Sequence, residues 1–253
     1  MAHPVKIKFC GLTDLDDAGD ALDAGAWAIG LIFWPRSPRR CALDTAVQIA
    51  AAAKRRAEVV GVFVNPTLDD VARIADAVGL TMLQLHGDEG PAFCAEAARR
   101  TGCKVIKAAR VRSRAEIQGL GPFHTDFHLL DSYAPGIPGG TGETFSWELA
   151  RAHRGVPMIL SGGLNAANVA EAIAVVAPYA VDVASGVERA PGRKDPAKVR
   201  AFAAAVAGTA PVAGTAPVAG TAPAADTAPA ADPRQAVASP LETAQDAHAG
   251  AVR

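Results

Sequence analysis

Apolar and polar residues alternate at the start of the chain. Residues 5–14 read VKIKFCGLTD, where apolar residues at positions 5, 7 and 9 alternate with two lysines and a cysteine until Gly11 ends the pattern. A period of two is typical of a strand whose two faces meet different surroundings. The pattern predicts a strand over residues 5–9, with Cys10 directly after it on the same face as Lys8 and Lys6.

Short β-rich runs alternate with longer helix-like segments further along the chain. The predicted strands cover residues 5–9, 28–33, 59–64, 82–85, 104–108, 127–130, 158–160 and 180–183. Helix starts are predicted at Thr13, Asp44, Thr67 and Asp195, because side chains of these types cap the first turn of a helix. This alternation indicates parallel βα units.

Eight βα units within residues 1–206 predict an α/β fold of the (β/α)₈ type, a TIM barrel that forms the catalytic domain. A doubly wound open sheet is the alternative. It is disfavoured because no GxGxxG segment follows the first strand, while the glycine-rich segments come after the sixth, seventh and eighth strands.

The end of the chain has a different composition. Residues 207–233 repeat a six-residue unit of small residues and proline, AGTAPV, with few large apolar side chains. Such a segment buries too little surface to offset the entropy of ordering it. We therefore expect residues 207–253 to form a disordered, low-complexity tail without a specific docking role.

Composition narrows the class of protein. Apolar residues make up 50% of the chain, and 25 basic residues nearly balance 26 acidic ones, with no basic cluster interleaved with aromatic residues. We expect no nucleic-acid partner. No segment has the length of a membrane span or the pattern of a signal peptide, so we expect a cytoplasmic protein that does not contact membranes. The four cysteines form no CxxC pair, which argues against a disulfide framework or a zinc site.

The two late glycine-rich segments predict a phosphate site. In a TIM barrel, working groups lie at the carboxyl ends of the strands, and SGGLN (161–165) and ASGVE (184–188) follow the seventh and eighth strands. Gly162, Gly163 and Gly186 let backbone N–H groups approach a phosphate closely. The alternative is that these glycines only form tight turns. We favour a phosphorylated small-molecule substrate.

Cys10 is a candidate base or nucleophile at the mouth of the barrel. Its alternation with the apolar residues places it on the interior face, about 6.6 Å from Lys8 between Cα atoms. A lysine charge at that distance favours the thiolate and lowers the pKa of Cys10. The alternative is a buried packing residue, the role expected for Cys41, Cys94 and Cys103.

Asp131 is a candidate general acid. It follows the largely apolar run 127–130, and apolar surroundings raise the pKa of a carboxyl group. The alternative is an ordinary carboxylate that caps a loop. Asp182, at the end of the eighth strand, is a second candidate acid or a residue that orders its loop.

Arg39 is a candidate for binding a substrate carboxylate. It lies in the loop FWPRSPRR after the second strand, where Arg36 and Arg40 compete for the same role and a solvated basic loop is the alternative. His86, in QLHGDE after the fourth strand, either contacts the substrate or, as we favour, orders its loop.

Eight motifs, taken together and in order, resemble those of the phosphoribosylanthranilate isomerase family of tryptophan biosynthesis. The resemblance covers residues 5–206. The motifs are KFCGLT, GLIFWPRSPR, GVFVN, LQLHGDE, LLDS, GGTGETFSW, ILSGGLN and VDVASGVE.

The resemblance implies a barrel that converts N-(5-phosphoribosyl)anthranilate into 1-(2-carboxyphenylamino)-1-deoxy-D-ribulose 5-phosphate by an Amadori rearrangement, with no metal or organic cofactor. It implies that Cys10 is the general base, that Asp131 is the general acid and that Arg39 binds the anthranilate carboxylate. A monomer is expected on the same ground. The phosphate-binding residues it implies are Gly162, Gly163, Ser185 and Gly186.

The chain departs from the family pattern at two positions. Phe9 stands where the family more often has isoleucine, and we expect it to face the helices without effect. Ala184 replaces a serine, which removes a hydroxyl near the phosphate but leaves the backbone donors.

Two other functions stay open at this point. The histidine-pathway isomerase performs the same rearrangement on a substrate with two phosphates, but that family has an aspartate where this chain has Cys10. A barrel that binds phosphorylated ligands without catalysis is the other alternative. The presence of Cys10, Asp131 and Arg39 together argues against it.

Overall fold

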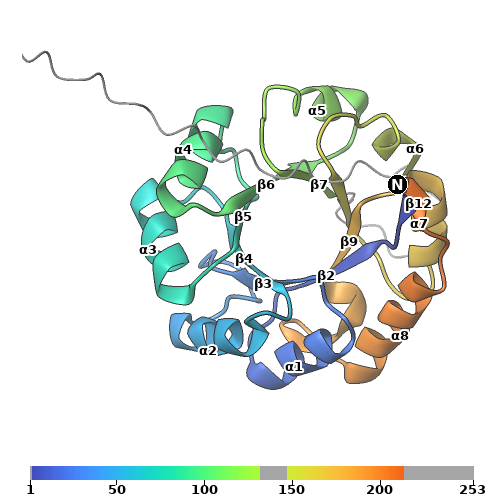
Figure 1. The fold of residues 1–253 in the computed structure, drawn as a ribbon, viewed down its shortest axis with the longest axis horizontal. Coiled ribbons are helices and arrows are strands. Elements are labelled where there is room, and N and C mark those ends of the chain that lie inside the picture. The colour runs from blue at the N-terminus through green and yellow to red at the C-terminus, as the bar shows by residue number, and fades with distance from the viewer. Residues whose placement is uncertain (1, 132–146, 214–253) are drawn as a thin grey trace, which may run out of the picture. The chain divides into compact units, whose positions relative to one another are not determined.

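The predicted strands form one closed parallel barrel (Figure 1). The computed structural model describes residues 2–131 and 147–213. β2 pairs with both β3 and β9, which closes the sheet and excludes the open-sheet alternative. In order around the barrel, the strands are β2 (Lys6–Cys10), β3 (Ala28–Ile32), β4 (Glu58–Phe63), β5 (Met82–Leu85), β6 (Lys104–Arg110), β7 (Phe127–Asp131), β8 (Met158–Ser161) and β9 (Ala180–Val183).

Helices surround the barrel on the outside (Figure 1). They are α1 (Leu15–Asp23), α2 (Leu43–Ala53), α3 (Leu68–Val78), α4 (Pro91–Thr101), α5 (Arg114–Gln118), α6 (Trp147–Ala150), α7 (Val169–Val176) and α8 (Pro196–Ala207). None of these described helices is long and apolar enough to cross a membrane.

Two of the four predicted helix starts are confirmed. Thr67 accepts a hydrogen bond from the backbone N–H of Asp70, and Asp195 caps α8 in the same way. The prediction at Thr13 was wrong by one residue, since Thr13 donates its hydroxyl to the Gly192 carbonyl and Asp14 caps α1 instead. The prediction at Asp44 was also wrong, because α2 begins directly after Ala42.

The first barrel strand has the two faces that its alternation predicts. Ile7 and Phe9 belong to the apolar layer between the strands and the helices, where the Phe9 ring lies 6.1 Å from that of Phe202 in α8. Cys10 belongs to the separate cluster inside the barrel. Lys8 is completely buried. The phenylalanine that departs from the family pattern therefore faces the helices, as expected.

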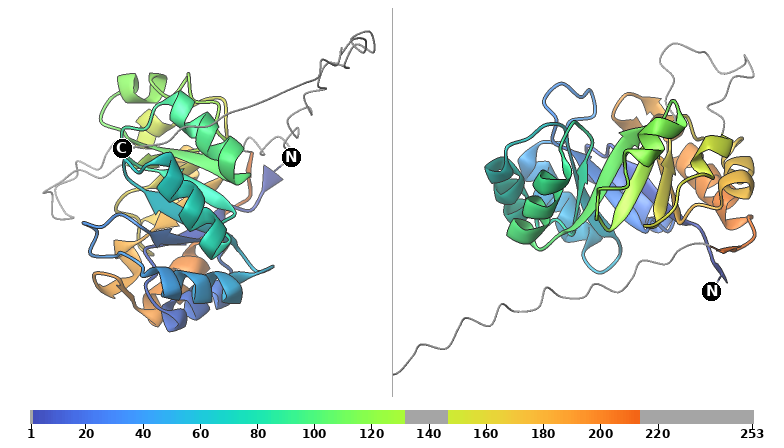
Figure 2. Two further views of the ribbon diagram at one scale, coloured as in Figure 1. Left: turned by 90° about the vertical axis from the view of Figure 1, so that its left-hand side faces the viewer. Right: turned by 90° about the horizontal axis from the view of Figure 1, so that it is seen from above.

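Among the described residues, four short strands lie outside the barrel. β1 (Ala2–His3) pairs antiparallel with β12 (Val212–Ala213), at the end where the barrel strands begin (Figure 2). β10 (Glu188–Ala190) and β11 (Arg193–Lys194) form a hairpin after the 3₁₀ helix η1 (Ser185–Val187). Residues 207–213 of the predicted tail thus have described structure, while 214–253, and the motif GGTGETFSW up to Ser146, lie outside the described residues.

Side chains fill the barrel interior at the end where the strands begin. The rings of Trp27, Phe127 and Tyr179 contact one another there, with centroids 5.4 to 5.6 Å apart. Lys6 lies over two of these rings. These side chains close the end of the barrel at which the strands begin, and the carboxyl ends of the strands form the opposite mouth.

Candidate active site

The two predicted acid–base residues end two barrel strands at the same mouth. Cys10 is the last residue of β2 and Asp131 the last residue of β7, so the strands extend one residue further than predicted. Asp131 pairs in register with Ser161 at the end of β8. Parallel strands bring their carboxyl ends to one edge of the sheet, which is why residues far apart in the sequence meet here.

Cys10 lies beside a buried ion pair. Nζ of Lys8 donates to Oδ1 of Asp182 over 2.8 Å, and the hydroxyl of Ser161 donates to Oδ2 of the same carboxylate over 3.2 Å. Gly30 leaves room for this arrangement, because a Cβ there would lie 2.7 Å from Sγ of Cys10 and 3.2 Å from Nζ of Lys8. Thiol and ammonium group are therefore packed against the same point of β3.

Burial dominates the protonation of Cys10. It raises the pKa of the thiol, and the opposing effect of the Lys8 charge only partly offsets it. The expectation that Lys8 lowers the pKa of Cys10 overall was wrong, because the 5% exposed residue has lost most of its hydration. On Lys8 burial has the opposite effect and works to lower the pKa, but Asp182 and Cys10 raise the pKa above its usual value, so Lys8 stays a cation.

Asp131 is more accessible than Asp182. Its side chain is 17% exposed, and its Oδ2 lies 3.5 Å from Nε2 of His86. Nδ1 of His86 is 2.9 Å from Nε2 of Gln84. His86 is thus held on one side by its own strand and faces the carboxylate on the other.

The structure distinguishes Arg39 from the two neighbouring arginines. Nε and Nη2 of Arg39 donate to the two carboxylate oxygens of Glu188 over 2.8 and 2.7 Å, whereas Arg36 and Arg40 are exposed. Nζ of Lys194 donates to the same glutamate over 3.1 Å. Sequence reasoning missed Glu188 and Lys194 as site residues, although Glu188 ends the quoted motif VDVASGVE.

The glycine-rich loops approach each other closely. Gly162 and Gly163 have φ values of 97° and 64°, which side chains disfavour. A Cβ on Gly186 would lie 1.9 Å from the carbonyl oxygen of Leu164, so only glycine fits between the loops after β8 and β9. The carbonyl of Ala184 accepts from Nζ of Lys194 over 3.1 Å, which fixes the backbone where the family's serine is replaced.

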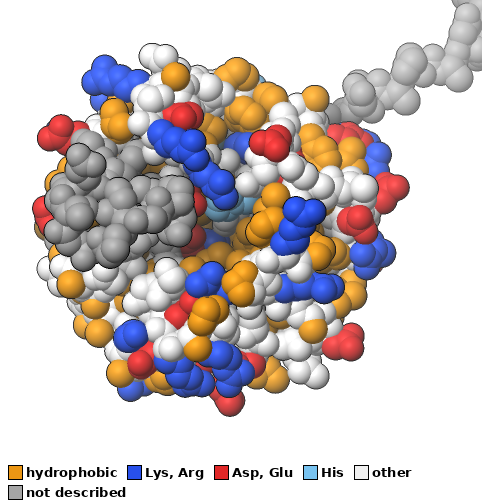
Figure 3. All heavy atoms as spheres, turned by 180° about the vertical axis from the view of Figure 1, so that it is seen from behind, with side chains coloured by type: hydrophobic (Ala, Val, Ile, Leu, Met, Phe, Trp, Pro, Cys, Tyr) orange, Lys and Arg blue, Asp and Glu red, His pale blue; other side chains and the backbone are white. Residues whose placement is uncertain are grey.

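A cavity of about 720 Å³ opens at this mouth, beside the ends of β3 to β6. His86, Trp34 and Arg110 contribute to its wall. Figure 3 shows this end of the molecule, with a central hollow that contains a histidine side chain and is bordered by basic side chains. No group of three or more potential metal ligands occurs among residues 2–131 and 147–213.

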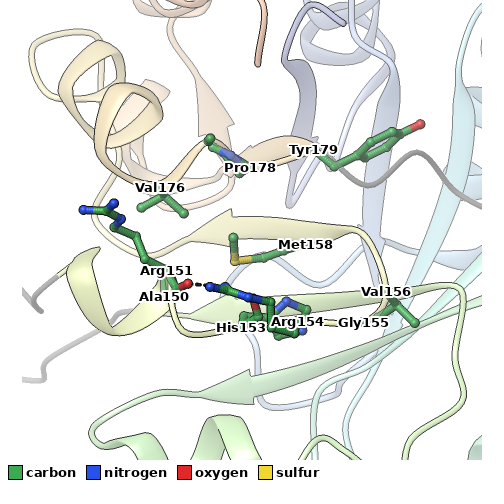
Figure 4. Close-up of a pocket in the computed structure, with 11 residues that line it drawn as sticks. Ala150, Arg151, His153, Arg154, Gly155, Val156, Met158, Val176, Pro178 and Tyr179 are labelled. Atoms are coloured by element: carbon green, nitrogen blue, oxygen red, sulfur yellow. Dashed lines mark hydrogen bonds between the residues drawn. The ribbon is translucent and has the colours of Figure 1, made fainter. Parts of the chain in front are cut away.

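A second cavity, of about 220 Å³, lies at the opposite end (Figure 4). Met158 and Tyr179, near the starts of β8 and β9, line it together with His153. The guanidinium of Arg154 donates to the carbonyl oxygens of Arg151 and His153. None of the predicted site residues lies there.

Comparisons with known proteins agree on one family. A family model described as N-(5'phosphoribosyl)anthranilate (PRA) isomerase matches residues 7–205. An N-(5'-phosphoribosyl)anthranilate isomerase from Citrifermentans bemidjiense is 49% identical over 196 residues, which cover 77% of this chain and 93% of the relative. The enzyme of the same name from Pseudomonas syringae pv. syringae is 47% identical over 207 residues, or 81% of this chain and 98% of the relative.

Solved structures give the same result. Phosphoribosyl anthranilate isomerase from Thermotoga maritima is similar with a TM-score of 0.74 and 38% identity, covering 81% of this chain and 99% of that one. A second structure, in complex with reduced 1-(o-carboxyphenylamino)-1-deoxyribulose 5-phosphate, has a TM-score of 0.71 and 36% identity, with 81% and 99% coverage. A third is described as mutually generated monomers of the dimeric Thermotoga maritima enzyme, with a TM-score of 0.70, 36% identity and the same coverage.

Proposed function

The chain belongs to the N-(5'-phosphoribosyl)anthranilate isomerase family of tryptophan biosynthesis, and on that premise we propose that Cys10 and Asp131 are its general base and general acid. The reaction would convert N-(5-phosphoribosyl)anthranilate into 1-(2-carboxyphenylamino)-1-deoxy-D-ribulose 5-phosphate. The observation that carries the assignment is the position of both residues at the ends of β2 and β7, at one mouth of the barrel.

The rearrangement needs one acid and one base. Asp131 protonates the furanose ring oxygen while the bond from that oxygen to C1 breaks, which leaves a protonated Schiff base. Cys10 as thiolate removes the proton from C2, and the electron pair moves to the imine nitrogen to give an enolamine. Tautomerisation of the enolamine yields the ketone. The protonated imine accepts the electrons itself, so the side chains supply only proton transfer and orientation.

Asp131 suits the role of acid better than Asp182. Asp182 is 5% exposed, and its Oδ1 accepts a hydrogen bond from the Lys8 ammonium over 2.8 Å inside the barrel. Asp131 is more exposed and faces the mouth of the barrel beside His86. In this arrangement Asp182 forms an ion pair with Lys8, which lies next to the proposed base. The proton transfer is assigned to Asp131.

Substrate binding is assigned to two sets of residues at the mouth. We assign the anthranilate carboxylate to Arg39, whose guanidinium is held in place by a buried glutamate. Phosphate is assigned to the loops after β8 and β9, where glycines bring two backbone segments together. The residues assigned to phosphate are Gly162, Gly163, Ser185 and Gly186.

Removal of the base or the acid tests the assignment. Cys10→Ala and Asp131→Asn should each lower kcat by about 10²–10⁴-fold with KM little changed, because each takes part only in proton transfer. Cys103→Ala is the matched control, since Cys103 is a buried thiol that donates to the Leu80 carbonyl away from the mouth. Turnover of Cys10→Ala at the rate of the control would remove Cys10 from the mechanism.

The histidine-pathway activity and the non-catalytic barrel are not favoured as alternatives, since the matched family model and both curated relatives carry the anthranilate isomerase description. The monomeric state and the cytoplasmic location stay predictions. Sedimentation equilibrium of the full chain tests the monomeric state, because the molar mass that it gives would be twice that of one chain for a dimer.

A further inference from the structure

Glu188 joins three segments around the candidate active site. It begins the β10–β11 hairpin, and its side chain is 5% exposed. It accepts two hydrogen bonds from Arg39 in the loop after β3, one from Lys194 in β11 over 3.1 Å, and one from the backbone N–H of Gly192 over 3.3 Å. One buried carboxylate therefore accepts hydrogen bonds from two cationic side chains and from the backbone of the hairpin turn.

Lys194 connects this carboxylate to the base. Its side chain is 1% exposed, and besides Glu188 it donates to the carbonyl oxygens of Cys10 over 2.7 Å and Ala184 over 3.1 Å. The ends of β2 and β9 are thus linked to the hairpin. Burial works to raise the pKa of Glu188, but hydrogen bonds from Arg39 and the charge of Lys194 lower it below its usual value. Glu188 stays ionised.

The backbone at Gly11 also accommodates Arg39. Gly11 has a φ of 75°, and a Cβ there would lie 2.8 Å from Cδ and 3.2 Å from Cβ of Arg39. The methylene chain of the arginine therefore lies against the backbone of the residue that follows the base. With its stem on Gly11 and its Nε–Nη2 edge on Glu188, the guanidinium is fixed at both ends.

This geometry restricts how a second carboxylate can bind. An arginine binds a carboxylate most strongly through two parallel hydrogen bonds along one edge of its planar group. Glu188 takes the Nε–Nη2 edge. A second carboxylate can form a paired contact only along the edge between Nη1 and Nη2.

We propose that Glu188 is a positioning residue for carboxylate recognition, which holds Arg39 so that the anthranilate carboxylate binds along its Nη1–Nη2 edge. The proposal rests on the assignment of that carboxylate to Arg39. Glu188 does not touch the substrate and acts through the arginine. Lys194 supports it by keeping the glutamate charged and by anchoring it to the strand of the base.

Two ligands separate this role from a purely structural one. The first is reduced 1-(o-carboxyphenylamino)-1-deoxyribulose 5-phosphate, and the second is the same molecule with hydrogen in place of the carboxylate. Calorimetry on the full chain gives both Kd values, and their ratio measures recognition of the carboxylate alone. A general loss of folding or of phosphate binding affects both ligands and leaves the ratio unchanged.

Glu188→Gln should reduce this ratio at least about tenfold, because the arginine loses its charged partner. Arg39→Ala should abolish the preference, and Glu188→Gln added to Arg39→Ala should change the ratio no further, since the glutamate acts only through the arginine. Glu89→Gln is the matched control. Glu89 is also buried and bound to a buried lysine, Lys107, and the variant should keep the ratio of the unaltered protein.

Each other outcome has a defined meaning. If Arg39→Ala abolishes the preference but Glu188→Gln leaves it unchanged, the inference is overturned and the proposed function stands. If the double variant loses more than Arg39→Ala, Glu188 acts by another route and the inference is again wrong. If Arg39→Ala keeps the full preference, the carboxylate assignment itself fails. Should Glu188→Gln not fold, Glu188→Asp, which withdraws the carboxylate by one methylene, is judged by the same outcomes.

Discussion

Lys8 is the residue on which the proposed base depends most. A thiol with a pKa raised by burial gives little thiolate near neutral pH, and the Lys8 ammonium is the largest opposing influence. Lys194 acts in the same direction as Lys8, and Asp182 in the opposite one. The proposed base therefore depends on its cationic neighbours and not on exposure to water.

Lys8→Met should lower kcat/KM at neutral pH at least about tenfold and move the rise of the pH profile to higher pH, since it removes the charge that favours the thiolate. Asp182 would lose its buried partner, so a loss of about 3–5 kcal/mol in unfolding free energy is also expected. The pH profile of kcat/KM and urea unfolding measure the two effects. Lys6→Met is the control, because Lys6 lies over Trp27 and Tyr179 at the closed end. Equal profiles for both variants would contradict this account of Cys10.

Single residues of the site were predictable to different degrees. The period of two placed Lys8 and Cys10 on one interior face, because alternation depends only on strand geometry. Glu188 and Lys194 were missed, since a contact across a hairpin leaves no periodic pattern. The net direction of the pKa of Cys10 was also wrong, because the loss of hydration depends on how completely the surrounding strands cover the thiol.

At the scale of elements, the proposed phosphate site depends on the fit between the loops after β8 and β9. Gly186→Ala would bring its Cβ to 1.9 Å from the Leu164 carbonyl, so these loops must move apart. We expect a loss of about 1–3 kcal/mol in stability and weaker inhibition by inorganic phosphate. Gly90→Ala, where a Cβ would meet nothing within 4 Å, is the control. Unchanged phosphate inhibition in Gly186→Ala would remove these loops from the phosphate site.

A pair of histidines links β7 to the segment after α6. Nδ1 of His128 lies 2.9 Å from Nε2 of His153, and Arg154 is the neighbouring charge. Burial and His128 lower the pKa of His153 from 6.5 to about 4. The unfolded chain therefore takes up its proton near pH 6.5 and the folded protein only near pH 4. The stability contributed by the neutral ring is complete above 6.5 and is lost as the pH falls from 6.5 to 4.

Urea unfolding between pH 7 and pH 4 tests this link. His153→Gln should reduce the pH dependence in that window, because glutamine keeps a polar partner for His128 but does not titrate, and burial of His128, which lowers its pKa, accounts for the remaining slope. His124→Gln, at an exposed histidine, should leave the slope unaltered. A slope in His153→Gln equal to that of the unaltered protein would contradict the assignment.

The barrel strands were predicted closely, and the elements around them less well. The observed bounds of β5 and β9 equal the predicted ones, because short apolar runs between turn residues leave little freedom. The start of α2 was missed, because its cap uses no side chain. The two-residue strands β1 and β12 were also missed, since strands this short have no detectable period.

At the scale of the whole molecule, the two ends of the barrel have separate tasks. Proposed chemistry lies at the carboxyl ends of the strands, while the pairing of β1 with β12 and the aromatic cluster lie at the other end. We propose that residues 214–253 are dispensable for both tasks. The described chain up to β12 is then sufficient for folding and turnover.

Two truncations distinguish the contribution of residues 214–253 from that of β12, which lies within the predicted tail. A chain of residues 1–213 should keep the kcat/KM and Tm of the full chain. A chain of residues 1–206 lacks β12 and with it the buried Val212. The lost apolar burial should lower the free energy of unfolding by about 1–2 kcal/mol. Its Tm should therefore fall by several degrees, while kcat/KM stays unaltered. Differential scanning calorimetry and steady-state kinetics decide this. A loss of activity in 1–213 would contradict the proposal that the tail is dispensable.

The isomerisation itself is the central claim, and one measurement tests it directly. Phosphoribosylanthranilate is generated in place from anthranilate, and its fluorescence is followed after addition of the purified full chain or of Cys10→Ala. We predict that the fluorescence decays at a rate proportional to the concentration of the unaltered protein, and at least about 10²-fold more slowly with the same concentration of the variant. Constant fluorescence with both proteins would contradict the claim.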